Sequence, residues 1–452
     1  MALLKWLYPG MRVKRWFFLF TGGVVACGFS LALLLNYKFI GAVEGTLFNL
    51  VYQTTGTYYG WVPTLVGAVV LTLGLLMMGY AMRRIIRSIV EVVAPEGTDR
   101  LGDIIYQKRR LDRGPSVVVI GGGTGLSTLL RGLKVRSSNL TAIVTVADDG
   151  GSSGRLRQDL GIVPPGDLRS CLVALADTEP LMEKLFQYRF AGSGDLAGHS
   201  FGNLFIAAMT QVVGGDIEQA LQQSSKVLAV RGHVLPSANC SVRLSAEMAD
   251  GSIIHGESAI PLSGKSIRRV MIEPADVSAV KAAVEAILQA DAVVLGPGSL
   301  YTSVLPNLLV REIAAALKQT KALRMYVCNV MTQPGETAGY KASDHLQALF
   351  DHAGAGIVDC VLVNVEEVAG CLLDQYAKQG ACPVEPDIAV LEAMGVRVLP
   401  GQLVSATNWV RHNPVRLARL IFATLEEWRK QLANGDARKQ AMSESEDKAA
   451  SS

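Results

Sequence analysis

The hydrophobic pattern of the chain changes near residue 114, and the part before that point contains two long apolar runs. They span residues 16–35 and 61–82, and neither contains a charged side chain. At about 1.5 Å per residue, a helix of roughly 20 residues crosses a hydrocarbon core of about 30 Å. A cleaved signal peptide would explain the first run only, and its apolar segment would be shorter. We therefore predict two transmembrane helices, at about residues 16–36 and 61–82.

Beyond residue 114 the pattern alternates between short apolar runs and amphipathic helical repeats. The predicted strands are 117–120, 140–146, 292–295, 325–330, 359–365 and 396–399, and the predicted helices are 126–133, 277–289, 308–318 and 414–432. Such alternation is typical of a parallel sheet covered on both faces. Between residues 233 and 275 the segments are shorter and alternate apolar with polar residues. We predict an α/β fold, namely a doubly wound, Rossmann-like, mostly parallel sheet with a small β insertion, preceded by the two-helix transmembrane hairpin.

Charge is distributed unevenly between these two parts. Residues 1–113 contain 13 Lys and Arg against 6 Asp and Glu, a net +7, whereas the remainder sums to −4. Basic residues flank the outer ends of both apolar runs. The connection at 36–60 contains only two charged residues, Lys38 and Glu44. By the positive-inside rule, both termini and the main domain face the cytoplasm. The sequence therefore predicts a multi-pass protein of the plasma membrane.

These changes of pattern predict four segments. They are a membrane anchor at 1–90, a charged juxtamembrane linker at 91–114, a nucleotide-binding domain at 115–434 and a disordered, polar tail at 435–452. The basic cluster at 108–110 follows the predicted spans, so we expect anionic lipid headgroups there rather than nucleic acid. Seven cysteines without a CxxC pair exclude a disulfide framework.

The first glycine-rich segment follows the strand predicted at 117–120. Glycines let the backbone approach a phosphate closely, and a following helix offers free N–H groups and a positive dipole end. No Lys-Ser/Thr pair of a Walker A loop follows, and Leu126 replaces the third glycine of a dinucleotide fingerprint. We predict an anion-binding loop rather than a plain turn, with the nucleotide left open. Its candidate binding residues are Gly122, Gly123, Thr124 and Gly125.

The second segment places two acids, Asp148 and Asp149, before four Gly and Ser residues, and Asp167 and Arg169 follow. An acid about 23 positions after the first loop can bond a ribose hydroxyl. Paired carboxylates can instead hold a magnesium ion that bridges phosphates, and Asp149 and Asp167 are the candidate ligands. An Asp-Gly turn alone needs neither the second acid nor the Gly and Ser run. Both the ribose and the metal interpretation stay open.

A third junction of strand, glycine-rich loop and helix start supplies hydroxyl groups beside backbone N–H groups, which suits a second phosphate. Its candidates are Gly296, Gly298, Ser299, Thr302 and Ser303. Two more segments are rich in amides and contribute Asn203 and Asn329, side chains that suit a neutral polyol or a base edge. His199 is more typical of a structural histidine than of a catalytic one.

Together these segments resemble the YvcK-like, or gluconeogenesis factor, branch of the CofD family. The resemblance covers residues 115 to about 430 and rests on six ordered motifs: VVVIGGGTGLSTLLRGLK at 117–134, ADDGGSSGRLR at 147–157, PPGDLRSCLVALA at 164–176, GHSFGNLFIAA at 198–208, LGPGSLYTSVLPNLLV at 295–310 and CNVMTQPGET at 328–337. It implies a Rossmann-type fold. The family's transferases pass a phospholactyl group from a nucleotide diphosphate donor to a deazaflavin, using magnesium. YvcK-like members are associated with binding UDP-sugars such as UDP-N-acetylglucosamine, and with cell shape and peptidoglycan synthesis during gluconeogenic growth.

The resemblance assigns the two glycine-rich loops to phosphate binding, matches Asp148 and Asp149 to the family's acidic pair, and matches His199, Asn203 and Asn329 to the regulatory branch. One position departs from the transferases: their Pro-Asp-Leu-Asp-Thr stretch is Pro-Gly-Asp167-Leu-Arg169-Ser here. An arginine in place of an acid lowers the negative charge available for magnesium and adds a phosphate donor. This departure favours nucleotide binding over metal-dependent transfer.

We therefore expect a membrane-tethered, UDP-sugar-binding regulator, with cell-envelope synthesis proteins and a second copy of the chain as partners and no nucleic acid. A magnesium-dependent phospholactyl-type transferase is the first alternative, and its candidate catalytic residues are Asp148, Asp149, Asp167 and His199. An NAD-dependent oxidoreductase is the second alternative, and the missing third glycine disfavours it.

Overall fold

The computed structural model describes residues 14–34, 45–46, 49, 52–53, 61–93, 106, 109–177, 180–368, 370–406 and 410–450. The chain divides into two units, Met1–Lys108 and Arg109–Ser452, and each is described by itself. Most of the predicted loop at 36–60 and most of the predicted linker at 91–114 lie outside the described residues.

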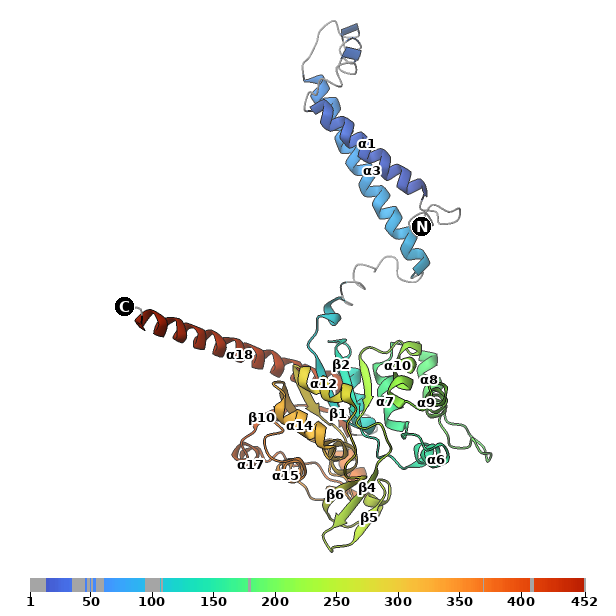
Figure 1. Ribbon diagram of the computed structural model, residues 1–452, viewed down its shortest axis with the longest axis vertical. Coiled ribbons are helices and arrows are strands. Elements are labelled where there is room, and N and C mark those ends of the chain that lie inside the picture. The colour runs from blue at the N-terminus through green and yellow to red at the C-terminus, as the bar shows by residue number, and fades with distance from the viewer. Residues whose placement is uncertain are drawn as a thin grey trace. The chain divides into compact units, whose positions relative to one another are not determined.

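The first unit contains two long apolar helices, α1 (Lys14–Leu34) and α3 (Val62–Val93), which lie side by side in Figure 1. Small residues allow the two backbones to approach closely. A Cβ added at Gly23 would lie 2.9 Å from the carbonyl oxygen of Gly74, and Ser30 Oγ donates to the carbonyl of Gly67 at 2.6 Å. Both helices are long and apolar enough to cross a membrane, with 18 and 25 residues meeting that criterion.

The second unit is built on a seven-stranded sheet with the order β10-β9-β8-β7-β1-β2-β3. Its strands are β1 (Val117–Gly121), β2 (Leu140–Val144), β3 (His233–Pro236), β7 (Ala292–Leu295), β8 (Leu323–Val327), β9 (Cys360–Asn364) and β10 (Arg397–Gly401). Every neighbouring pair is parallel. The strand order proceeds outward from β1 in one direction and from β7 in the other, so the topological switch point lies between β1 and β7. This confirms the predicted doubly wound parallel sheet.

Helices cover both faces of this sheet. The helices of the second unit are α5 (Gly123–Leu133), α6 (Gly151–Leu160), α7 (Gly166–Leu175), α8 (Pro180–Gln187), α9 (Phe201–Val212), α10 (Ile217–Val227), α11 (Ala259–Leu262), α12 (Lys281–Gln289), η4 (Leu300–Val304), α13 (Leu305–Leu308), α14 (Arg311–Gln319), α15 (Ala342–Ala353), α16 (Gly370–Ala377), α17 (Ile388–Ala393) and α18 (Pro414–Ala450). On one face α5 packs against α7 and α18, and on the other α12 packs against α14. Right-handed crossovers on either side of the switch point put α14 on the face opposite α5.

The predicted β insertion is a three-stranded antiparallel sheet with the order β5-β4-β6. Its strands are β4 (Arg243–Met248), β5 (Ile253–His255) and β6 (Ile267–Glu273), and Figure 1 shows it beside the main sheet. β3, which the sequence placed with this insertion, instead pairs with β2 in the main sheet. A second small element was not predicted: β11 (Val404–Ala406) and β12 (Val410–His412) form an antiparallel ribbon. Strands of three residues are too short to give a readable period.

Two boundaries differ from the sequence expectation. α5 begins at Gly123 rather than near Leu126, so the loop between β1 and α5 is shorter than expected. α18 continues to Ala450 and so includes residues 435–450, for which a disordered tail was expected. The Lys, Arg, Glu and Gln residues that make this segment polar, together with its alanines, have high helix propensity.

Candidate functional site

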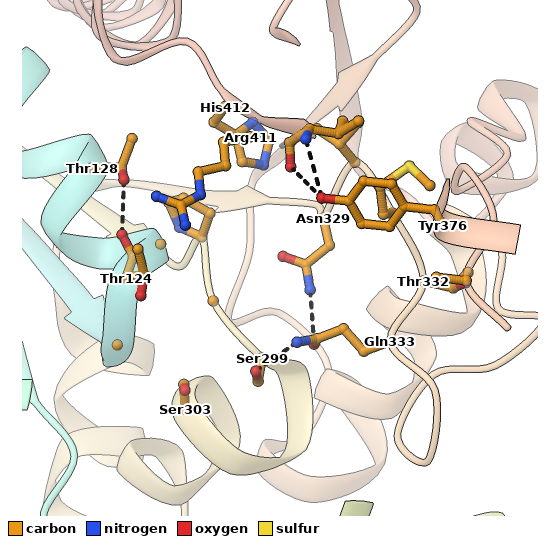
Figure 2. A pocket seen from close by; sticks show the side chains of 18 of the residues that line it. Thr124, Thr128, Ser299, Ser303, Asn329, Thr332, Gln333, Tyr376, Arg411 and His412 are labelled. Carbon is orange, nitrogen blue, oxygen red and sulfur yellow. Dashed lines mark hydrogen bonds between the residues drawn. The ribbon is translucent and has the colours of Figure 1, made fainter. Parts of the chain in front are cut away.

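A cavity of about 390 Å³ lies at the switch point, where β1 and β7 end. Figure 2 shows its polar side chains, which come from five separate segments of the chain. It is lined by residues 122–125, Thr128, residues 297–299, Ser303, residues 329–334, Tyr376, Gln379, Ala381 and residues 410–412. Ligands of doubly wound sheets bind at this place in the fold. Of the predicted binding residues, the structure brings Gly122, Gly123, Thr124, Gly125, Gly298, Ser299, Ser303 and Asn329 together here.

The first glycine-rich loop turns directly from β1 into α5. Gly123 has a φ of +65°, a conformation that favours glycine, and Gly122 caps α5 without a side-chain hydrogen bond. The first N–H groups of a helix have no partner within the helix. The start of α5 therefore presents backbone donors and the positive end of the helix dipole at the cavity.

The two glycine-rich loops touch each other across the switch point. A Cβ at Gly125 would lie 2.5 Å from the carbonyl oxygen of Pro297, so a larger residue at this position would push the loops apart. Asn307 fixes their spacing: its Nδ2 donates to the carbonyls of Gly121, at 3.2 Å, and Ser303, at 2.8 Å, from a fully buried position. Asn307 was not among the predicted site residues. It acts by positioning the two loops.

The second loop is joined to the amide-rich segment at the end of β8. Gln333 Nε2 donates to Ser299 Oγ at 2.8 Å, and Asn329 Nδ2 lies 3.4 Å from Gln333 Oε1, as the dashed lines of Figure 2 show. Thr302 does not line the cavity. Its hydroxyl donates to the buried carboxylate of Glu336 at 3.1 Å, which also accepts from the backbone N–H of Tyr301 at 3.2 Å. Glu336 thus takes up the donors that Thr302 was expected to offer to phosphate.

Sequence reasoning missed the far wall of the cavity. Arg411, on the β11–β12 ribbon, extends towards Thr124 and Thr128 in Figure 2. The hydroxyl of Tyr376 accepts from the backbone N–H of Val410 at 3.1 Å and so holds the ribbon in place. Burial lowers the pKa of His412 to about 4, so its ring is neutral at pH 7. Among the described residues that line the cavity, Arg411 carries the one formal charge and none is Asp or Glu.

The predicted acids lie behind the first loop rather than in the cavity. A Cβ added at Gly122 would lie 2.5 Å from Asp167 Oδ2, and Asp167 accepts the backbone N–H of Gly123. Burial, reinforced by the neighbouring charge of Asp148, raises the pKa of Asp167 to about 6. Asp148 in turn accepts the N–H of Gly150 at 3.0 Å. The turn at Gly122 and Gly123 therefore separates the acids from the cavity.

Asp149 connects the main sheet to the β insertion. Its Oδ2 accepts from the N–H of Glu257 and its Oδ1 from the N–H of Ser258, both at 2.9 Å. Glu257 is brought close to the other acids, and burial together with Asp148 and Asp149 raises its pKa to about 8. We call Asp148, Asp149, Asp167 and Glu257 the acidic cluster. It forms a structural joint as well as a concentration of negative charge.

Two other predicted residues, His199 and Asn203, lie beside the start of α6, and Gly296 follows β7 without lining the cavity. Ser152 Oγ lies 3.0 Å from His199 Nδ1 and accepts from Asn203 Nδ2 at 3.1 Å. Burial lowers the pKa of His199, and Arg169 Nη2 donates to Ser170 Oγ at 3.3 Å. None of His199, Asn203 and Arg169 is among the residues that line the cavity. The buried contacts of His199 and Asn203 join α6 to α9.

The metal prediction concerns Asp149 and Asp167. Within the described ranges, no three or more His, Cys, Asp or Glu side chains come close enough together to hold a metal ion. Each of the two carboxylates already accepts backbone N–H groups. Magnesium takes oxygen ligands and keeps several of its waters, so a site with few protein ligands agrees with its chemistry. The assignment of Asp149 and Asp167 to a metal stays a prediction.

Known proteins resemble this chain over most of its length. A family profile described as 2-phospho-L-lactate transferase CofD matches residues 117–404. The gluconeogenesis factor of Bacillus subtilis is 51% identical over 314 residues, which cover 69% of this chain and 99% of that protein. A protein of Nostoc sp., provisionally named a gluconeogenesis factor, is 48% identical over 421 residues, or 92% of this chain and 91% of its own length. That alignment is longer than the second unit, so the similarity extends into the first.

A solved structure has the same fold. Protein BH3568 from Bacillus halodurans is 54% identical, covers 69% of this chain and 100% of its own, and superposes with a TM-score of 0.67. The profile match at residues 117–404 includes all six motifs. The chain therefore belongs to the CofD family and, within it, to the YvcK-like branch whose members are named gluconeogenesis factors.

Proposed function

We propose that the chain binds a UDP-sugar, similar to UDP-N-acetylglucosamine, in the cavity at the switch point. The observation that supports this most strongly is the charge of the cavity wall: two glycine-rich loops, several hydroxyls and Arg411, with no acid among the described lining residues. Backbone N–H groups at a helix start and a guanidinium are the donors that proteins use for phosphates. The pyrophosphate would lie between the two loops.

The rest of the cavity suits the neutral parts of such a ligand. Asn329, Gln333 and Gln379 offer amides that can donate and accept, which matches sugar hydroxyls or a base edge. Tyr376, Val330 and Met331 supply an apolar wall. The volume of about 390 Å³ lies in the range of small-molecule sites, roughly 300–1,000 Å³.

Calorimetry tests this proposal directly. The full-length chain, purified in mild detergent, is titrated with UDP-N-acetylglucosamine with and without magnesium. We expect saturable binding to one site that does not require the metal, since the acidic cluster lies outside the cavity. Failure to bind any uridine nucleotide would contradict the proposal.

We further propose a regulatory role in cell-envelope synthesis and carbon metabolism. Relatives named gluconeogenesis factors support the metabolic part, and a UDP-sugar is a building block of envelope polymers. Deletion of the gene should then impair growth on gluconeogenic carbon sources and alter cell shape. Rescue by the wild-type chain and failure of rescue by a chain that does not bind UDP-sugar would link the role to the cavity.

A transferase is the second candidate function. The family profile is described as a phospholactate transferase, and the acidic cluster contains Asp167, whose pKa is raised to about 6 by burial. Product formation from a nucleotide diphosphate donor with magnesium, lost in Asp149→Asn, would support it. Since Asp149 also holds the β insertion, the variant's fold must be verified by circular dichroism. Asp250→Asn, at an exposed turn of the same insertion, is the matched control.

We also propose that α1 and α3 anchor the chain in the plasma membrane with both termini in the cytoplasm. The apolar length of both helices, the close approach at Gly23 and Gly74, and the Arg side chains at their outer ends support this. Alkaline extraction should leave the chain in the membrane fraction. A tag at residue 450 that external protease removes from intact cells would contradict the orientation.

A further inference from the structure

A second cavity, of about 320 Å³, lies where α6 meets the β insertion. It is lined by Asp149, Gly154, Arg157, Gln158, Arg243, His255 and Gly256. It shares no lining residue with the cavity at the switch point. Asp149, Gly154 and Arg157 belong to the motif at 147–157, but the proposed UDP-sugar site uses none of these three side chains.

Two arginines from different elements converge on this cavity. Arg157 comes from α6 and Arg243 begins β4. In the part of the chain that the structure describes, neither guanidinium has an ion-pair or hydrogen-bond partner. Burial lowers the pKa of Arg157, the charge of Asp149 raises it, and the charge of Arg243, a smaller effect, lowers it because the two cations repel each other. Such a pair is stabilised when an anion is placed between its members.

The acids nearest to these arginines are engaged elsewhere. Asp149 accepts two backbone N–H groups with its two oxygens. Glu273, which pairs with Arg243 across the strands of the insertion, accepts from Ser245 Oγ at 3.1 Å and lies 3.7 Å from His255 Nδ1. The donors of Arg157 and Arg243 are therefore left for a ligand, with the ring of His255 beside them.

We propose that this second cavity binds the phosphate group of a small phosphate monoester. Guanidinium groups bind phosphate through two parallel hydrogen bonds, and two of them match a dianion. Two guanidinium groups attract a doubly charged monoester more strongly than a singly charged anion, and Asp149 in the lining weakens this attraction without cancelling it. The volume of about 320 Å³ lies in the range of small-molecule sites.

A ligand here would join two parts of the second unit. It would contact α6 of the parallel-sheet body through Arg157 and the β insertion through Arg243 and His255. The same junction contains the bonds from Asp149 to the loop that carries Glu257. Phosphate binding would therefore hold the insertion more tightly against the parallel-sheet body. The protein would then respond to a second ligand at a site separate from its UDP-sugar site.

Arginine footprinting on the wild-type, full-length chain tests the site without any mutation. The chain in mild detergent is treated with phenylglyoxal in the presence of inorganic phosphate, glycerol 3-phosphate or, at equal ionic strength, chloride, and modification is quantified by peptide mass spectrometry. We expect at least a fivefold slower modification of Arg157 and Arg243 with glycerol 3-phosphate than with chloride. Arg268, an exposed residue of β6 paired with Glu247 at 2.8 Å, serves as the internal control. If glycerol 3-phosphate did not slow the modification of Arg157 and Arg243, or slowed that of Arg268 equally, the proposal would be overturned.

Calorimetry with glycerol 3-phosphate supplies the second test. Arg157→Gln and Arg243→Gln should each weaken binding at least tenfold, and Arg268→Gln should leave it unchanged. Tighter binding of succinate than of glycerol 3-phosphate would overturn the assignment to phosphate. Arg411→Ala and saturating UDP-N-acetylglucosamine should not affect glycerol 3-phosphate binding. This site can therefore be present even if the UDP-sugar proposal fails, and absent even if that proposal holds.

Discussion

The two sides of the turn at Gly122 and Gly123 differ sharply in charge. On one side lies the cavity at the switch point, where Arg411 is the one charged group among the described lining residues. On the other side lies the acidic cluster, with Asp167 so close that a Cβ at Gly122 would meet its carboxylate at 2.5 Å. One thin segment of backbone thus separates four carboxylates from a cavity whose described lining contains an arginine and no acid. Motifs adjacent in sequence, which suggest one nucleotide site, can supply two opposite environments.

The largest effect should come from removing the positive charge of the cavity side. Arg411→Ala is expected to weaken UDP-sugar binding roughly 30- to 100-fold, since hydrogen bonds to charged groups contribute about 2–3 kcal/mol. Arg397→Ala, which removes an exposed arginine paired with Glu427, is the matched control and should leave binding unchanged. Both affinities are measured by calorimetry. An effect of Arg411→Ala below threefold would mean that the phosphates bind on the other side of the turn.

The next effect concerns the joint that keeps the loops together. Asn307→Ala removes two buried hydrogen bonds, to Gly121 and Ser303, and should lower the free energy of unfolding by about 2 kcal/mol. Asn139 also donates from Nδ2 to two backbone carbonyls, but from an exposed position, so Asn139→Ala should cost well under about 1 kcal/mol. Urea denaturation followed by circular dichroism compares them. If both variants lost the same free energy of unfolding, the buried hydrogen bonds of Asn307 would contribute no more than the exposed ones of Asn139.

A smaller effect should follow from adding an acid to the cavity side. Ser299→Glu is expected to weaken UDP-sugar binding roughly tenfold through repulsion of the phosphates. Ser299→Gln introduces nearly the same volume without the charge, and the difference between the two variants isolates the electrostatic part. Calorimetry at low and high salt should show that this difference shrinks as salt screens the charges. Identical affinities of the Glu and Gln variants would place the phosphates away from this loop.

The sequence predicted the strands and loops around the site. It did not predict that the cavity and the acidic cluster lie on opposite sides of the turn. The β-branched run of β1 and the glycines after it carry strong local signals, since buried parallel strands are continuous apolar runs and tight junctions need glycine. The strand order around the switch point, and with it the meeting of residues 122–125 with residues 297–299, follows from that fold class. These parts of the cavity were foreseeable from the pattern alone.

The rest depended on contacts between distant segments. Arg411 belongs to a strand of three residues with no period to detect, and Tyr376, which holds that strand, is an isolated residue in a helix. Glu336 is 34 residues away from Thr302, whose hydroxyl it accepts. Asp149 was expected to face a ligand because it follows a strand, but two backbone N–H groups from the insertion over 100 residues later bind its carboxylate. Periodicity and motif spacing carry no information about such pairings.

The smallest effect tests the acid side of the turn. The pKa of Glu257 is raised by burial and by Asp148 and Asp149 to about 8, from 4.5. Between pH 4.5 and 8 the folded state keeps a proton that the unfolded state has lost, so stability falls as the pH rises through this window and levels off above it. Glu257→Gln removes this loss. Its Tm should exceed that of the wild type by about 2–4 °C at pH 8.5 and equal it near pH 4.5.

Glu285→Gln, on α12 outside both sides of the turn, is the matched control for the loss of one carboxylate. Thermal unfolding at a series of pH values separates the two variants, and a Tm gain that does not depend on pH would contradict the role assigned to Glu257.

The UDP-sugar affinity of Glu257→Gln at pH 7 adds the sharper comparison. Because Glu257 lies behind the turn, Glu257→Gln should bind as the wild type does. An altered affinity would mean that the acidic cluster and the cavity act as one site, as expected for a transferase that uses both.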